Sequence, residues 1–249
     1  MEKVKISAVS YLNTIPFIYG MEESKDFLNQ VDLEKDIPST CAEKLLLGKV
    51  DLGLIPVAAI PQMKEYHLIS DYCIGAVNKV DTVLLLSDVP LEEIENIYLD
   101  FHSRTSVRLC QLLAEKYWKI DVQYLKAEEG FIDKVEGKTA AVLIGDRTFN
   151  RSKKHNYSYD LSEEWMKWQK LPFVFAAWVS NKKLPTHFIQ QFNSVLKHGV
   201  DHIDEAIDKY NLDIITPEAQ KKYLKHSISY SLDQEKRKGL QTFLDLISS

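Results

Sequence analysis

The stretch Leu99-Asp100-Phe101-His102-Ser103-Arg104-Thr105-Ser106 joins an expected strand to an expected helix. A strand-like apolar run at 97–99 precedes it, and apolar residues recur at helical spacing over 107–118 behind it. A helix that begins directly after a strand presents unpaired backbone N–H groups at the positive end of its dipole. This junction is therefore a candidate anion-binding site.

The side chains of this junction are suited to the same task. The hydroxyls of Ser103, Thr105 and Ser106 can supplement the backbone donors, and Arg104 can hold a carboxylate with two parallel bonds. The alternative is that Ser103 only caps the helix and that Arg104 is a solvated charge. The sequence leaves both interpretations open.

A second polar turn follows the strand expected at residues 5–9. It carries Ser10, Tyr11 and Asn13, and turns that follow strands in α/β proteins commonly contact ligands. The Asn13 amide can both donate and accept hydrogen bonds. A purely structural Asx turn is the alternative for this segment.

Two further expected strands have polar residues at one end. Thr82 opens an apolar strand over 81–87, and Gly145 and Asp146 follow a strand at 140–144. Asp146 has the groups to orient Arg104 or to contact a substrate hydroxyl, although it could equally cap the next helix. These residues come from different strands but can converge on one site together with Asn13.

Composition places the chain among ordinary globular proteins. Its 249 residues are 45% hydrophobic and 27% charged, with a formal charge of −5. No basic stripe suggests nucleic acid, and no apolar run approaches the roughly 20 residues that span a bilayer. The N-terminus lacks the apolar core of a signal peptide, and the three cysteines form no CxxC pair. We therefore expect a cytoplasmic protein, without nucleic-acid or membrane partners, that is a monomer or homodimer.

The alternation of strands and helices predicts an α/β fold with two lobes. Residues 1–88 and 174–249 are expected to form the first lobe, and residues 89–173 the second. The chain would cross between them near 87–91 and again near 171–175. Polar strand ends from both lobes would then face a shared ligand cleft.

Several stretches together resemble the chorismate dehydratase family, MqnA. They are Ser10-Tyr11-Leu12-Asn13-Thr14, Gly48 to Val57, Leu99-Asp100 with Ser103-Arg104-Thr105-Ser106, Ile144-Gly145-Asp146, and Leu171 to Trp178. They occur in the family's order and cover about residues 5–180. The first and third are specific in combination, whereas the helical tail carries little of the pattern.

The resemblance implies a fold like that of the type II periplasmic binding proteins. It also implies that a small-molecule substrate, chorismate, loses water to give 3-[(1-carboxyvinyl)oxy]benzoate on the futalosine route to menaquinone. Neither a cofactor nor a metal is implied. The family's important asparagine corresponds to Asn13, and Thr82 stands where the family has a serine, which keeps the hydroxyl and adds a methyl group.

The base for this elimination is not obvious from the motifs. An amide such as Asn13 does not accept a proton near neutral pH, whereas Asp146 and His102 are possible bases. Our hypothesis is that the substrate's own enolpyruvyl carboxylate takes the proton while Asn13 and Thr82 hold it in place. Two other functions remain open, namely a cytosolic carboxylate-binding protein without catalysis and the dihydroxynaphthoate synthase of the same pathway.

Overall fold

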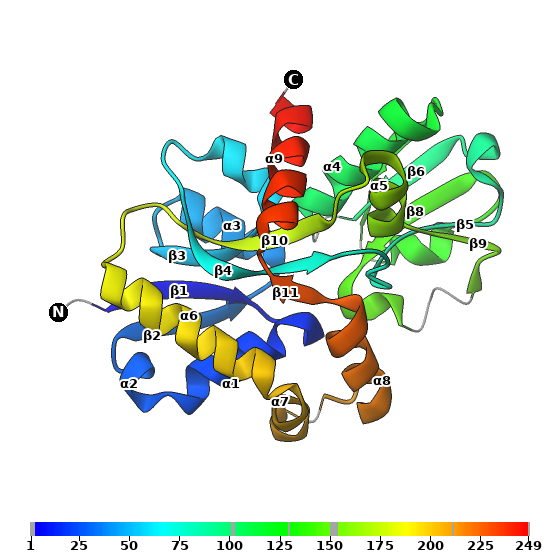
Figure 1. Cartoon of the computed structure of the whole chain (residues 1–249). Coiled ribbons are helices and arrows are strands. Elements are labelled where there is room, and N and C mark those ends of the chain that lie inside the picture. The colour runs from blue at the N-terminus through cyan, green and yellow to red at the C-terminus, as the bar shows by residue number, and fades with distance from the viewer. Residues whose placement is uncertain (1–2, 101–102, 129, 150–153, 211, 249) are drawn as a thin grey trace.

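Two β-sheets flanked by helices form two lobes that lie side by side (Figure 1). The computed structural model describes residues 3–100, 103–128, 130–149, 154–210 and 212–248. Both termini of the described chain belong to the first lobe. None of the helices in these ranges is long and apolar enough to cross a membrane.

The first sheet has six strands and mixed topology. In spatial order they are β11 (Ser229–Ser231), β4 (His67–Ala76), β10 (Phe173–Ser180), β3 (Leu52–Pro56), β1 (Val4–Val9) and β2 (Val31–Asp36). Strand β1 pairs in parallel with β2 and β3, while β10 runs antiparallel to β3 and β4. All eight residues of β10 are buried, which is the pattern of a central strand covered on both faces.

The second sheet has five strands. In spatial order they are β7 (Gln123–Lys126), β6 (Asn96–Leu99), β8 (Thr139–Ile144), β5 (Val83–Ser87) and β9 (Tyr157–Asp160). Strand β6 is parallel to β7 and β8, and β5 is antiparallel to β8 and β9. The carboxyl ends of β6 and β8 therefore lie together at one edge of the sheet.

The first crossing between the lobes lies earlier in the chain than the sequence indicated. We expected residues 1–88 in the first lobe, but β5 (Val83–Ser87) pairs with β8 and β9 of the second sheet. The crossing is therefore the segment 77–82, between β4 and β5. An apolar run predicts a buried strand but carries no information about which sheet takes it, because its partners are distant in the sequence. The chain returns to the first sheet at β10.

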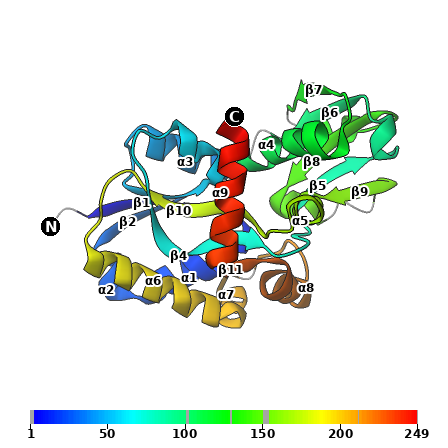
Figure 2. The same cartoon turned by 45° about the horizontal axis from the view of Figure 1, so that its top comes forward.

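Helices cover both faces of the first sheet. Helices α1 (Ile15–Glu23) and α6 (Thr186–Asp201) pack against each other on one face, with α3 (Pro38–Leu46) and α9 (Gln234–Ser248) on the other (Figure 2). The α1–α6 contact is a backbone contact, since a Cβ on Gly199 would lie 1.7 Å from the carbonyl oxygen of Pro16. Helix α9 also contacts α4 (Arg104–Leu112) of the second lobe.

The remaining helical segments are short. They are η1 (Leu12–Thr14), α2 (Lys25–Leu28), η2 (Val57–Gln62), η3 (Leu91–Glu93), α4 (Arg104–Leu112), η4 (Leu113–Trp118), η5 (Phe131–Lys134), η6 (Gly145–Thr148), α5 (Leu161–Gln169), α7 (Ile203–Tyr210), α8 (Pro217–Lys222) and η8 (Tyr223–Ser227). Helix α4 and the π-helix η4 follow one another without a break, and they occupy the region over which the sequence predicted a helix.

Candidate functional site

A cavity opens where the two lobes meet, and the space in and around its mouth that no protein atom fills, open solvent included, is about 510 Å³. Both sheets and the crossing between them contribute to its lining, which consists of Val9, Tyr11, Asn13, Thr14, Pro38, Pro56, Ile74, Val80, Thr82, Val83, Ser103, Ser106, Ile144, Gly145, Phe175 and Ala176. A mostly apolar wall with a few polar groups is typical of sites that bind small organic molecules.

Six of the site residues expected from the sequence meet in this cavity, although they are far apart along the chain. They are Tyr11, Asn13, Thr82, Ser103, Ser106 and Gly145. The four others, Ser10, Arg104, Thr105 and Asp146, are absent from its lining. His102, one of the possible bases, lies outside the described residues.

Asn13 sits in the 3-10 turn η1, directly after the parallel strand β1. Its side-chain oxygen accepts a hydrogen bond from the Thr14 hydroxyl at 3.1 Å, and its backbone carbonyl accepts one from the Tyr230 hydroxyl at 2.9 Å. The second lobe contributes as well, because the Asp146 carboxylate accepts from the Leu12 N–H at 3.1 Å. Contacts from both lobes thus fix the turn that carries Asn13.

Asp146 therefore acts as a cap of η1 rather than of the helix that follows it in the chain. Asp146 lies in η6, just after strand β8 of the second lobe, and its carboxylate pairs with a backbone donor at the start of η1 in the first lobe. Burial raises the pKa of the Asp146 carboxyl to about 6, against the smaller opposing effect of the Leu12 N–H. The charged form is costly here because little water reaches it.

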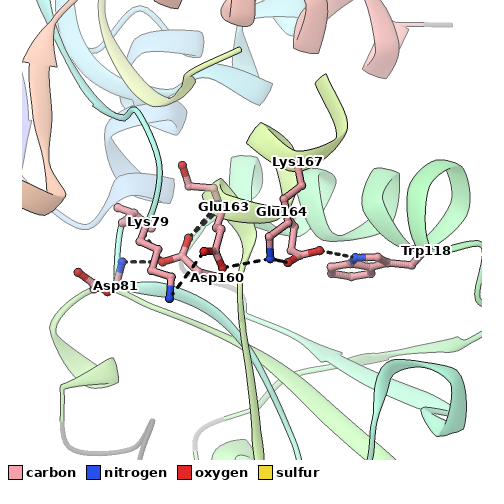
Figure 3. A network of polar contacts seen from close by, with 9 residues as sticks. Lys79, Asp81, Trp118, Asp160, Glu163, Glu164 and Lys167 are labelled. Carbon is pink, nitrogen blue, oxygen red and sulfur yellow. Dashed lines mark hydrogen bonds and ion pairs between the residues drawn. The ribbon is translucent and has the colours of Figure 1, made fainter. Parts of the chain in front are cut away.

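Thr82 lies in the crossing, where a carboxylate of the second lobe holds its neighbours. Asp160 accepts hydrogen bonds from the N–H groups of Val80 at 2.9 Å and Asp81 at 2.7 Å (Figure 3). Asp81 has a left-handed φ of 63°, and its own carboxylate accepts from the Ser227 hydroxyl. Burial raises the pKa of Asp160 to about 6, against the opposing effect of these N–H groups. The crossing thus has a defined shape at Thr82.

The same carboxylate begins a longer polar network over helix α5. Glu163 lies within 3.7 Å of the Lys79 ammonium, and Lys167 is 2.7 Å from a carboxylate oxygen of Glu164. The other oxygen of Glu164 accepts from the Trp118 indole N–H at 3.0 Å (Figure 3). The network links the crossing to α5 and to η4, and so places Thr82 relative to the second lobe.

Ser103 caps helix α4 and also lines the cavity. Its hydroxyl oxygen accepts from the Ser106 N–H at 3.2 Å, and the two hydroxyls are 3.0 Å apart. The capping interpretation is therefore confirmed for Ser103, a contact that typically contributes about 1 kcal/mol. The positive end of the α4 dipole faces the cavity at this point, because both Ser103 and Ser106 line it.

Three of the expected site residues have other roles. The Arg104 guanidinium donates to the Gln62 side chain at 3.1 Å and borders a separate hollow. The Thr105 hydroxyl accepts from the Ala58 N–H at 3.2 Å, which ties α4 to the first lobe. Ser10 is exposed, and its N–H donates to the Asp36 carbonyl. Helical geometry explains the first two, since adjacent side chains on a helix point in different directions.

Sequence reasoning missed Arg147, which carries a positive charge near the cavity. Its guanidinium pairs with the fully buried Asp100 and hydrogen-bonds the Tyr11 side chain. The Asp100 carboxylate also accepts from the Ile144 N–H at 3.2 Å, which joins the ends of β6 and β8. Burial raises the pKa of Tyr11 to about 12, although Arg147 opposes the shift. Tyr11 therefore stays neutral at physiological pH.

Two features of position 145 require a glycine, namely a left-handed backbone conformation and the closeness of the Tyr11 ring. The φ of Gly145 is +66°, and a Cβ there would lie 2.9 Å from Cε2 of the Tyr11 ring. We expect Gly145→Ala to lower the free energy of unfolding by about 1–3 kcal/mol in urea titrations. Gly137→Ala is the matched control, because Gly137 has a φ of +56° with no atom within 4 Å of a Cβ. Equal losses in the two variants would contradict a role for the Tyr11 contact.

Tyr223 was also missed, because the C-terminal tail carries no motif that would single it out. Its hydroxyl lies 2.7 Å from the hydroxyl oxygen of Thr82, which lines the cavity, although Tyr223 itself is not among the lining residues. Tyr223 opens the π-helix η8, where the spacing of side chains departs from the helical period that sequence patterns assume. Only the packing of the tail against the crossing reveals this contact.

Metal ligands do not cluster in the described part of the chain. Across residues 3–100, 103–128, 130–149, 154–210 and 212–248, no group of three or more His, Cys, Asp or Glu side chains is placed to hold an ion. The three cysteines, Cys41, Cys73 and Cys110, are buried and unpaired. Burial raises the pKa of each thiol to about 12, so they are not reactive nucleophiles.

Comparison with known proteins gives a family and a related sequence. A family model described as menaquinone biosynthesis matches residues 4–249. The chorismate dehydratase of Thermus thermophilus is 23% identical over 232 residues, which cover 85% of this chain and 84% of that protein.

Solved structures resemble the whole chain in fold. A protein from Archaeoglobus fulgidus superimposes with a TM-score of 0.79 at 16% identity, covering 99% of this chain and 97% of that one. A Candida albicans protein, described as having the generic periplasmic binding protein fold, gives a TM-score of 0.62 at 14% identity, covering 100% and 90%. The expected fold, α/β with two lobes like the type II periplasmic binding proteins, is confirmed.

Proposed function

The chain belongs to the menaquinone biosynthesis family, and we propose that within this family it is a chorismate dehydratase. The related Thermus thermophilus enzyme supports this activity. So does the meeting of Asn13, from the turn after β1, and Thr82, from the crossing, in a single cavity. That convergence is the observation on which the proposal chiefly depends.

The cavity offers neutral donors rather than cations to an anionic substrate. Among the described lining residues, no side chain is a lysine, an arginine or a histidine. The Tyr11 hydroxyl, the Asn13 amide and the N-terminal end of α4 supply hydrogen-bond donors instead. Such donors bind carboxylates well when they are held in place and water is excluded. Arg104 has no part in this proposal.

The proton acceptor is proposed to be the substrate. The part of the lining that the structure describes contains no aspartate, glutamate or histidine, and Tyr11 has its pKa raised to about 12. The enolpyruvyl carboxylate of chorismate is a base that arrives with the substrate. Holding that carboxylate against the ring C–H replaces a bimolecular proton transfer by an intramolecular one, which can contribute several kcal/mol.

The elimination balances without an outside reagent. The carboxylate removes the proton from the ring carbon that bears the enolpyruvyl ether, and the C–H electron pair forms the new ring double bond. The neighbouring carbon loses its hydroxyl as hydroxide, which takes up the transferred proton to become water. The ring becomes aromatic, which supplies the driving force, and the product is 3-[(1-carboxyvinyl)oxy]benzoate.

The direct test is conversion of chorismate by the purified protein. We expect an aromatic product that is lighter than chorismate by one water, formed without added metal or cofactor and detected by absorbance and mass spectrometry. Binding of chorismate with no product would indicate a binding protein instead. No binding and no product would reject the assignment of chorismate as ligand.

A further inference from the structure

We propose that Tyr223 is a positioning residue of this reaction, acting through the side chains of Thr82 and Asn13. The inference rests on the proposed dehydratase activity. Its hydroxyl lies 2.7 Å from the Thr82 hydroxyl oxygen and also hydrogen-bonds the Asn13 side chain. Tyr223 thus joins the two residues assigned to catalysis, which come from the crossing and from the N-terminal turn.

The tyrosine ring is held rigidly in this place. Tyr223 is 4% exposed, and its ring packs edge-to-face on Phe149 with centroids 5.2 Å apart. Phe149 follows η6 in the second lobe, whereas Tyr223 belongs to the C-terminal tail. A rigid ring gives its hydroxyl a fixed position, so the two groups that bond to it are restricted as well.

The hydroxyl can act as a donor throughout the physiological pH range. Burial raises the pKa of Tyr223, against the smaller lowering effect of the bonds from Thr82 and Asn13. A neutral phenol both donates and accepts one bond, so it can accept from the Asn13 amide and donate to Thr82. Thr14 donates to the Asn13 oxygen, which leaves the amide nitrogen as the end that faces Tyr223.

These bonds matter because both partners can rotate without them. The Thr82 hydroxyl has a second, longer contact at 3.4 Å to the Val80 carbonyl, and this weak bond alone would not fix it. The bond between the Thr82 and Tyr223 hydroxyls, whichever of them donates, restricts the directions in which the Thr82 oxygen faces the cavity. Loss of the phenol oxygen should therefore reduce orientation of the substrate rather than its affinity.

The test is Tyr223→Phe, which removes one oxygen and keeps the ring. We expect kcat for chorismate dehydration to fall about tenfold, with KM changed less than about threefold. Tyr210→Phe is the comparison, because the Tyr210 hydroxyl also bonds to a side chain, that of Glu22 at 2.8 Å, but Tyr210 does not line the cavity. It should lower kcat far less, while thermal melts should show similar losses of stability.

A double-variant cycle separates positioning from general loosening of the fold. Because Tyr223 still bonds to Asn13 in a Thr82→Val protein, adding Tyr223→Phe to Thr82→Val should lower kcat further, but by clearly less than the tenfold that it costs in the parental protein. Losses that multiply in the double variant, or a Tyr223→Phe protein with parental kcat, would overturn the inference while leaving the dehydratase activity intact. A parental protein that does not convert chorismate would instead reject the proposed function, and this inference with it.

Discussion

Asn13→Leu is expected to lower kcat for chorismate dehydration by about a hundredfold or more, with a much smaller change in KM. Leucine has nearly the shape of asparagine but cannot hydrogen-bond. The Thr14 hydroxyl and the Tyr223 hydroxyl would both lose a partner, and the substrate would lose a polar contact in the cavity wall. Steady-state kinetics on the purified variant measure the effect.

A matched control distinguishes loss of orientation from loss of fold. Asn193 on α6 also has a hydrogen-bonded amide, whose oxygen accepts from the Ser70 hydroxyl at 2.8 Å and from the Asp71 N–H at 2.9 Å. It does not line the cavity. We expect Asn193→Leu to reduce the free energy of unfolding and to keep the parental kcat. An Asn13→Leu protein within a few-fold of the parent would show that the amide is not needed.

Asp146→Ala and Asp146→Asn should differ sharply in activity. Asparagine keeps an oxygen for the Leu12 N–H, so the turn η1 and Asn13 stay in place. Alanine leaves that donor unpaired, and we expect kcat to fall about tenfold or more as the turn shifts. Turnover of Asp146→Asn should remain within about threefold of the parent. Complete loss of turnover in this variant with intact binding would identify Asp146 as the base, against the substrate-assisted mechanism.

The Asp146→Asn variant should also change how the free energy of unfolding depends on pH. Burial raises the pKa of Asp146 to about 6 from its ordinary 3.8, so the folded state holds the proton more tightly than the unfolded state. The associated stability is present below about pH 4 and is lost as the pH rises through about 6. Asp146→Asn removes this loss, on the order of 2 kcal/mol.

Urea titrations at pH 4.5 and pH 7.5 measure that difference. Asp160 carries a shift in the same direction, so the parental protein should lose stability over this interval through both groups. The Asp146→Asn protein should lose distinctly less. An unchanged pH dependence would mean that the Asp146 carboxyl is not buried in the folded protein as described.

The sequence determined the local elements and most of the chemistry of the site. The alternation of strands and helices predicted an α/β fold, and the polar turns after β1 and before α4 predicted Asn13 and Ser103 as site residues. Both predictions could be made because hydrophobic period and capping preference are properties of neighbouring residues. The resemblance to the chorismate dehydratases was equally local, since it depended on short motifs.

Only the tertiary structure decided which of these side chains share the cavity. Arg104 and Thr105 stand beside Ser103 in the sequence, yet they contact Gln62 and Ala58 outside the cavity lining. Strand β5 looked like part of the first lobe until its pairing with β8 and β9 placed it in the second. The physical reason is common to these cases: contacts between distant segments fix the direction of a side chain and the sheet that a strand joins. Such contacts cannot be predicted from the pattern of neighbouring residues in the sequence.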